Sequence, residues 1–91
     1  MKLTKKEVVE INKKMGKKFK TEFGLGGNRS NLDFALSLDE PYDIAKEIVR
    51  GHPFIDGNKR TGFMVYLLLT TKKGFDKILK DFDDIFLALS K

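Results

Sequence analysis

The residues whose types and spacing could do chemistry lie in one stretch, HPFIDGNKRTG, at positions 52–62. Its Asp-Gly pair predicts a tight turn, and Asn58 is a good N-cap for a helix that follows. Lys59 and Arg60 would then lie in the first turn of that helix, where a cation opposes the helix dipole and costs about 0.3–1 kcal/mol. Two cations in this position would be explained if an anion is to be held there.

The same stretch contains the other groups that phosphate chemistry needs. Free N–H groups of the first helical turn, the concavity that Gly57 allows and the two cations would together hold phosphates. Asp56 offers oxygen ligands to Mg²⁺, which usually takes one or two carboxylates plus substrate phosphate oxygens. His52 can accept a proton near neutral pH. Phe54 is interpreted as an apolar anchor that fixes the loop.

Each of these residues also has a purely structural interpretation. A single histidine that ends a helix more often caps it or hydrogen-bonds locally, and Lys59 and Arg60 could simply be solvated. The Asp-Gly-Asn sequence is common in turns that have no function. The joint order and spacing of the residues, rather than any one of them, favours a functional site.

Helices must position this stretch. Thr4 and Glu7 form a capping-box pattern, which predicts a first helix from near Thr4 or Lys5. The glycines of residues 24–31 end it and predict a flexible loop that could hold a small hairpin. The apolar stripe of this helix recurs at steps of three and four residues: Val8, Ile11, Met15, Phe19 and Phe23.

Three further helices and a short last one are expected. Ser30 or Asn31 would cap the second helix, which would turn inward Leu32, Phe34, Ala35, Leu36 and Leu38. Pro41 predicts the start of the third helix, and Gly51 with the His52-Pro53 pair predicts its end. A fourth is predicted from about Asn58 to Lys73, and Asp81 opens the last. We therefore expect an all-α bundle of about five helices with a glycine-rich loop.

Composition excludes other kinds of site. The 91 residues include no cysteine and a single histidine, so disulfide scaffolds, thiolate zinc sites, cysteine nucleophiles and multi-histidine metal sites are excluded. The longest apolar run, residues 62–69, is far below the roughly 20 residues that a membrane span needs. No apolar run of a secretory signal follows the N-terminal lysines. We expect a soluble, cytoplasmic protein with one domain over residues 1–91.

The net charge of +5 favours anionic partners. Eight lysines crowd the first twenty residues: Lys2, Lys5, Lys6, Lys13, Lys14, Lys17, Lys18 and Lys20. The simpler interpretation is the solvated face of an amphipathic helix, and the alternative is a docking surface for an acidic partner or nucleic acid. No DNA- or RNA-binding motif accompanies the lysines, which makes nucleic acid the weaker choice of partner.

The stretch at 52–62 resembles the signature of the Fic/Doc superfamily, and in particular that of the death-on-curing (Doc) branch, H-x-F-x-D-[AG]-N-K-R-T. Residues 27–36 also resemble the glycine-and-arginine loop of that branch and its following L-x-x-A-L helix. The resemblance extends over about residues 24–70. It implies a compact all-helical Fic fold that transfers part of a nucleoside triphosphate to a protein hydroxyl.

The resemblance also assigns roles to individual residues. His52 would be the general base, Asp56 would hold Mg²⁺, and Arg29 is a weaker candidate for contact with the nucleotide or the target. Residues 24–30 would form the flap that aligns the target segment. The phosphates of ATP would be bound by Gly57, Asn58, Lys59 and Arg60.

Two positions favour the Doc branch, whose members resemble kinases. Lys59 stands where the AMP-transferring Fic branch usually has glycine, and Phe63 stands where that branch has a second arginine. We therefore expect a Doc-like toxin kinase that uses ATP and Mg²⁺ to phosphorylate a Ser/Thr hydroxyl of a protein, with a translation factor such as elongation factor Tu or its counterpart as target. Because the chain contains no [S/T]-x-x-x-E-[G/N] inhibitory segment, restraint would come from an antitoxin protein. The alternatives are AMP transfer by the same loop and an inactive basic binding module.

Overall fold

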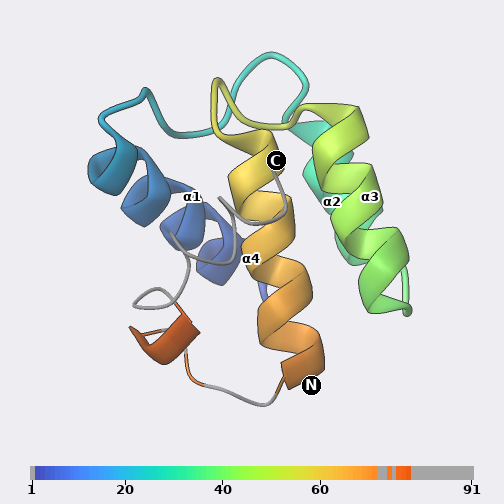
Figure 1. The fold of residues 1–91 in the computed structure, drawn as a ribbon. Coiled ribbons are helices and arrows are strands. Elements are labelled where there is room, and N and C mark those ends of the chain that lie inside the picture. The colour runs from blue at the N-terminus through green and yellow to red at the C-terminus, as the bar shows by residue number, and fades with distance from the viewer. Residues whose placement is uncertain (1, 72–73, 75, 79–91) are drawn as a thin grey trace.

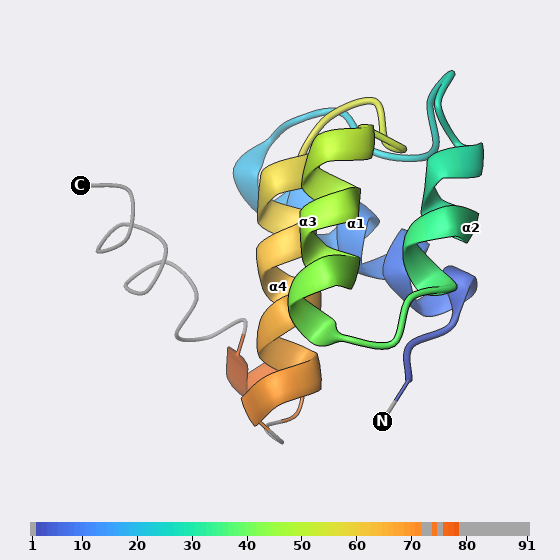
Figure 2. The same ribbon diagram turned by 90° about the vertical axis from the view of Figure 1, so that its right-hand side faces the viewer.

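The structure is a computed structural model that describes residues 2–71, 74 and 76–78. Four helices span most of this part: α1 (Lys5–Phe19), α2 (Ser30–Leu36), α3 (Pro41–Gly51) and α4 (Asn58–Thr71). α4 packs against both α1 and α3, and α2 packs against α3 (Figures 1 and 2). The predicted all-α class is therefore confirmed. The short helix expected from Asp81 lies outside the described residues.

Local signals set the helix starts. Thr4 caps α1, because its Oγ1 accepts a hydrogen bond from the Glu7 N–H at 3.2 Å while its own N–H donates to Glu7 Oε1 at 2.9 Å. Hydrogen bonding to Thr4, first of all from its backbone N–H to Oε1 and then from its side chain, lowers the pKa of the Glu7 carboxyl. Pro41 is the first residue of α3, as expected, because its missing N–H and fixed φ suit that position.

The end of α1 differs from the prediction. Lys20 adopts the left-handed conformation (φ 57°), and the Thr21 N–H donates to Gly16 O at 2.9 Å, so the helix ends before the glycines. Phe23 therefore lies outside α1 and folds back over it. A Cβ atom at Gly16 would lie 2.8 Å from Phe23, so this glycine leaves room for the ring.

α2 also differs in detail. Ser30 and Asn31 are its first residues rather than its caps, and Phe34 is 56% exposed. A helix of two turns has one buried face, and here Leu32 and Ala35 occupy it. The Asn31 Nδ2 donates to Gly51 O at 2.6 Å, which joins the start of α2 to the end of α3.

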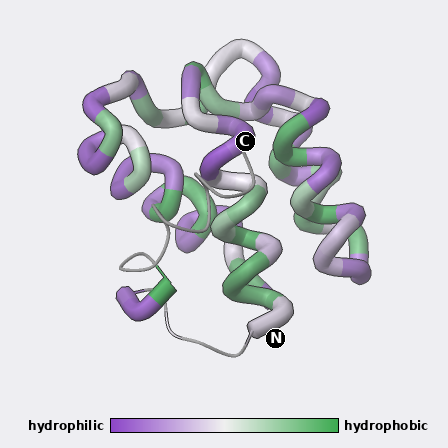
Figure 3. Tube along the Cα trace, in the orientation of Figure 1, coloured by the Kyte–Doolittle hydropathy of each residue, from purple (hydrophilic) through white to green (hydrophobic). Residues whose placement is uncertain are grey.

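The core lies between the helices, and the middle of α4 is strongly hydrophobic (Figure 3). Tyr66 nevertheless points outward, so α4 is not enclosed on every side. None of the described helices is both long and apolar enough to cross a membrane. The buried apolar side chains are Val8, Ile11, Met15, Leu32, Ala35, Ile44, Ile48, Phe54, Met64, Val65, Leu68 and Ile78.

α3 and α4 approach each other closely at Gly62. A Cβ atom there would lie 2.7 Å from Val49 Cγ2 and 3.0 Å from Ala45 O. Gly62→Ala should therefore lower the free energy of unfolding by about 1–3 kcal/mol, the usual cost of overpacking. Urea denaturation measures the loss. Gly27→Ala is the control, because nothing lies within 4 Å of a Cβ at that position; equal stability of the two variants would contradict the prediction.

Candidate active site

His52 ends α3 in an unusual backbone conformation. It is the C-cap residue of the helix, with φ 48° and ψ 55°, in the left-handed region that glycine usually occupies. A non-glycine residue held there costs of order 1–3 kcal/mol, and such residues cluster at functional sites. The turn leads the chain out of α3 into buried Pro53 and leaves the His52 side chain exposed.

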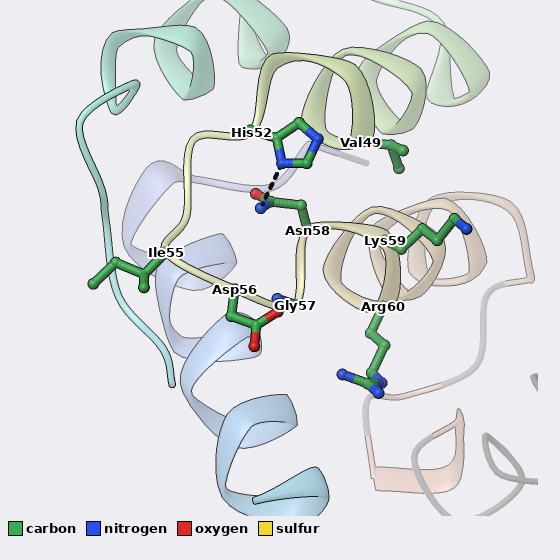
Figure 4. A pocket seen from close by; sticks show the side chains of 8 residues that line it. All are labelled: Val49, His52, Ile55, Asp56, Gly57, Asn58, Lys59 and Arg60. Atoms are coloured by element: carbon green, nitrogen blue, oxygen red, sulfur yellow. Dashed lines mark hydrogen bonds between the residues drawn. The ribbon is translucent and has the colours of Figure 1, made fainter. Parts of the chain in front are cut away.

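Asn58 braces the loop that carries His52. Its Oδ1 accepts a hydrogen bond from the Phe54 N–H at 2.9 Å, and its Nδ2 donates to Phe54 O at 3.0 Å and lies 3.3 Å from His52 Nδ1 (Figure 4). The Phe54 N–H can only donate, which fixes the orientation of the amide. His52 Nδ1 therefore accepts, and the hydrogen of the neutral imidazole lies on Nε2.

This arrangement refines two predictions. Asn58 does begin α4, but its side chain turns back to the loop instead of capping the helix, and at 6% exposure it is committed to that network. Its backbone N–H remains in the first turn of α4, where it could contact an anion. Phe54 is buried at 3% exposure, as expected of an anchor for the loop.

Asp56 and Gly57 form the predicted tight turn. Gly57 has φ 73°, its N–H donates to Asp56 Oδ1 at 2.7 Å, and its carbonyl accepts the Thr61 N–H at 2.9 Å. The Asp56 carboxylate is exposed. The described residues contain no group of three or more side chains that could hold a metal ion. Asp56 by itself would offer Mg²⁺ one protein ligand. That donor set suits Mg²⁺, which often takes its other ligands from phosphates and water.

The predicted residues meet around one open hollow of about 570 Å³ (Figure 4). Lys59 and Arg60 leave the first turn of α4 in different directions. Lys59 is exposed, whereas Arg60 is partly buried, with its guanidinium carbon 4.4 Å from the centre of the Phe19 ring. The hollow is lined by Val49, His52, Ile55, Asp56, Gly57, Asn58, Lys59 and Arg60.

Arg29 is the one predicted residue that does not line the hollow. It precedes α2, its side chain is exposed, and its Nε donates to Gly26 O at 3.2 Å. The structure therefore places Arg29 in the glycine-rich loop, apart from the other predicted site residues.

The glycine-rich loop (residues 24–31) pairs with the site loop (residues 52–57, between α3 and α4) and not with itself. Leu25 and Phe54 form an antiparallel bridge, in which the Gly26 N–H donates to Pro53 O at 2.9 Å and the Ile55 N–H donates to Gly24 O at 3.0 Å. The hairpin that the sequence allowed within residues 24–31 is thus absent from that described loop. The two loops lie side by side above α4 in Figure 1.

Sequence reasoning missed Asn12. It lies in α1 at 1% exposure and hydrogen-bonds to both loops and to α4. A signal was present, because Asn12 stands four residues after Val8 and three before Met15, at the spacing of the buried stripe. A polar side chain on a buried face needs partners, which makes such a residue a candidate for a role in the site.

Comparison with known families supports the resemblance. Residues 37–70, which contain α3, the site loop and most of α4, match the sequence model of the Fic/DOC family. The match covers a minority of the chain, and it does not separate the Doc branch from the rest of the superfamily. Neither the curated proteins nor the solved structures compared with the chain include a match.

Proposed function

We propose that this protein is an enzyme of Fic/Doc type that transfers the terminal phosphoryl group of ATP to a Ser or Thr hydroxyl of a protein. The observation that carries the proposal is the single hollow that joins His52, Asp56 and the N-terminal turn of α4. The family match over residues 37–70 supports the coarser statement, a Fic-type enzyme that transfers a nucleotide-derived group. The resemblance of the site loop to the Doc signature supports phosphoryl transfer.

The phosphates would lie against the first turn of α4. Its N–H groups and the positive end of its dipole attract anions, and Lys59 adds an exposed cation at the rim of the hollow. Arg60 contributes positive charge from beneath, where Phe19 holds its guanidinium. Positioning and charge neutralisation of this kind supply most of the rate enhancement in phosphoryl transfer.

In the proposed reaction the target hydroxyl oxygen attacks the γ-phosphorus. The bond from that phosphorus to the β–γ bridging oxygen breaks, ADP leaves, and the hydroxyl proton goes to His52. For Nε2 to accept this proton, the hydrogen of the imidazole must first move to Nδ1, which breaks the 3.3 Å contact with Asn58. An exposed imidazole can exchange its tautomers through water, so the contact would fix the resting ring without blocking the reaction.

Asp56 is the residue that would hold Mg²⁺, because it is the one carboxylate that lines the described hollow. Bound there, the ion would neutralise phosphate charge. The hydrogen bond from the Gly57 N–H to Asp56 Oδ1 holds the carboxylate at the turn, and Oδ2 makes no hydrogen bond or ion pair with the described residues. The carboxylate is therefore oriented and still has an oxygen to offer.

Labelled ATP identifies the group that the protein transfers. The protein would be incubated with purified translation factors, elongation factor Tu or its counterpart among them, and with ATP labelled at the γ position or at the α position. We expect label on a target from the γ position only. Label from the α position would establish AMP transfer instead, and no label from either with an active ATP stock would overturn the enzymatic proposal.

The inactive binding module is distinguished by its independence from the site loop. Two lysines near the N-terminus already have acidic partners, Lys5 with Asp33 at 3.1 Å and Lys2 with Asp39 at 3.8 Å. Binding of an acidic partner through the exposed face of α1 would survive loss of His52 and weaken steeply with salt. Binding and restraint by an antitoxin are proposed on the resemblance alone.

A further inference from the structure

The side chain of Asn12 hydrogen-bonds to three residues from three different parts of the described site. Its Oδ1 accepts a hydrogen bond from the Gly24 N–H at 2.7 Å, and its Nδ2 donates to Asp56 O at 2.9 Å and to Thr61 Oγ1 at 3.1 Å. The Gly24 N–H can only donate and the Asp56 carbonyl can only accept, so the orientation of the amide is fixed. Both Nδ2 hydrogens and the oxygen are in use.

These bonds close a ring through both loops. Asn12 bonds to Gly24 N; Gly24 O accepts from the Ile55 N–H at 3.0 Å; and Asp56, the next residue, bonds back to Asn12 through its carbonyl. The Gly57 turn rests directly on the amide, because a Cβ at Gly57 would lie 3.4 Å from Asn12 Nδ2. The ring thus fixes the glycine-rich loop, the expected flap, relative to Asp56, the residue expected to hold Mg²⁺.

Filling space in the core does not require an amide. A leucine at position 12 would supply apolar contacts but leave the Gly24 N–H and the Asp56 carbonyl without this partner, which destabilises any such group that is shielded from water. The buried polar side chains of the described residues are Asn12, Asn58 and Thr61. Thr61 bonds to Asn12, and Asn58 bonds within the loop that carries His52, so all three hydrogen-bond at the site.

We infer that Asn12 is a positioning residue. It fixes the glycine-rich loop and the site loop relative to each other, so that the metal ligand and the target-binding segment are aligned together. The inference rests on the proposed function. The loop that would carry the target and the loop that carries Asp56 and His52 are joined through the side chain of a third element, α1. Loss of the Asn12 side chain would therefore disturb the positions of both loops.

The first test compares kinetics in three variants. Asn12→Ala removes both loop contacts, and we expect kcat to fall about 10- to 100-fold and the KM for the protein target to rise, because small misplacements of catalytic groups are costly. Asn12→Asp keeps an acceptor for the Gly24 N–H but loses the donor to Asp56 O. It should raise the Mg²⁺ requirement and change the KM for the target less.

Val8→Ala is the matched control, one turn away in α1 and fully buried, with no hydrogen bond to either loop. It should lower the melting temperature while kcat, the Mg²⁺ requirement and the target KM stay within about twofold when every variant is assayed well below its melting temperature. If Asn12→Ala is destabilised but keeps these three wild-type constants, Asn12 is only structural and the inference is wrong. If Asn12→Ala does not fold, Asn12→Asp decides the question by its Mg²⁺ requirement.

A second measurement does not depend on transfer. Amide hydrogen exchange at Gly24 and Ile55 should be slow in the wild-type protein and about 10-fold or more faster in Asn12→Ala, relative to amides in the middle of α4. Val8→Ala should preserve the relative protection of both loops. Unchanged protection in Asn12→Ala would overturn the inference. Absence of transfer in the wild-type protein, with exchange as expected, would instead reject the proposed function and leave the coupling of the loops established.

Discussion

Replacing His52 with glycine is expected to abolish transfer and raise the stability of the protein. The imidazole is the proposed base, a role that contributes on the order of 10²–10⁴-fold to the rate. The same residue has φ 48° and precedes Pro53, a combination that is unfavourable for any side chain with a Cβ. Glycine adopts this conformation without that penalty, so relief of about 1 kcal/mol should raise the melting temperature by roughly 4–8 °C.

His52→Ala separates the two effects. Alanine also lacks the imidazole but keeps the Cβ, so it should lose transfer equally without the gain in stability. The rate is measured with labelled ATP at saturating target, and the melting temperature by circular dichroism. Full activity in either variant would refute the role of His52 as base. A lower melting temperature for the glycine variant than for the alanine variant would show that the left-handed turn is not the source of strain.

The opposite effects expected on stability and on activity follow from the backbone conformation of His52. A helix C-cap that served only structure would favour glycine or asparagine in the left-handed conformation. Retaining histidine there costs stability, and the cost places an exposed imidazole on the hollow that also meets the first turn of α4. Stability and activity are therefore expected to oppose each other at this position, as they often do where a strained residue performs chemistry.

Features that depend on neighbouring residues were predictable from the sequence. The capping box at Thr4, the proline that starts α3 and the turn before α4 each act within a few residues, and each lies where expected. The end of α1 was not predictable in this way, because a lysine, Lys20, takes the left-handed conformation and ends the helix before the glycines that the pattern predicted as its end. Phe23 then covers Gly16, a tertiary contact that replaces the expected helical stripe.

The same division applies to the site. The grouping of His52, Asp56 and the cations follows from nine consecutive residues, and the structure brings them around one hollow. The direction of the Asn58 side chain is set by bonds to Phe54 and His52, which the rule for N-cap residues does not anticipate. The role of Asn12 depends on the tertiary fold. Asn12 bonds to residues 12, 44 and 49 positions away, and no local periodicity reports such partners. The sequence showed a polar residue on an apolar helical face, and the structure shows which groups its side chain bonds to.

Replacing Asp56 with asparagine is expected to raise the Mg²⁺ concentration for half-maximal transfer roughly 10- to 100-fold. Asparagine has nearly the same shape, and its amide oxygen can still accept the Gly57 N–H that now bonds to Asp56 Oδ1, so the turn before α4 should survive. The change is then one of charge at the rim of the hollow. Asp33→Asn is the matched control, because it removes the same charge from an exposed residue that pairs with Lys5 and does not line the hollow.

The sign of the change at Asp56 separates two roles. If the carboxylate acts through Mg²⁺, its loss weakens the complex of metal and nucleotide, and transfer measured against Mg²⁺ concentration shifts to higher values. If it acts without a metal, it only repels the phosphates, and its loss should tighten nucleotide binding in a hollow already flanked by Lys59 and Arg60. Tighter binding of ATP with an unchanged Mg²⁺ requirement would therefore reject Asp56 as the metal ligand. A shift of the Mg²⁺ dependence in Asp56→Asn, absent from Asp33→Asn, would establish it as one.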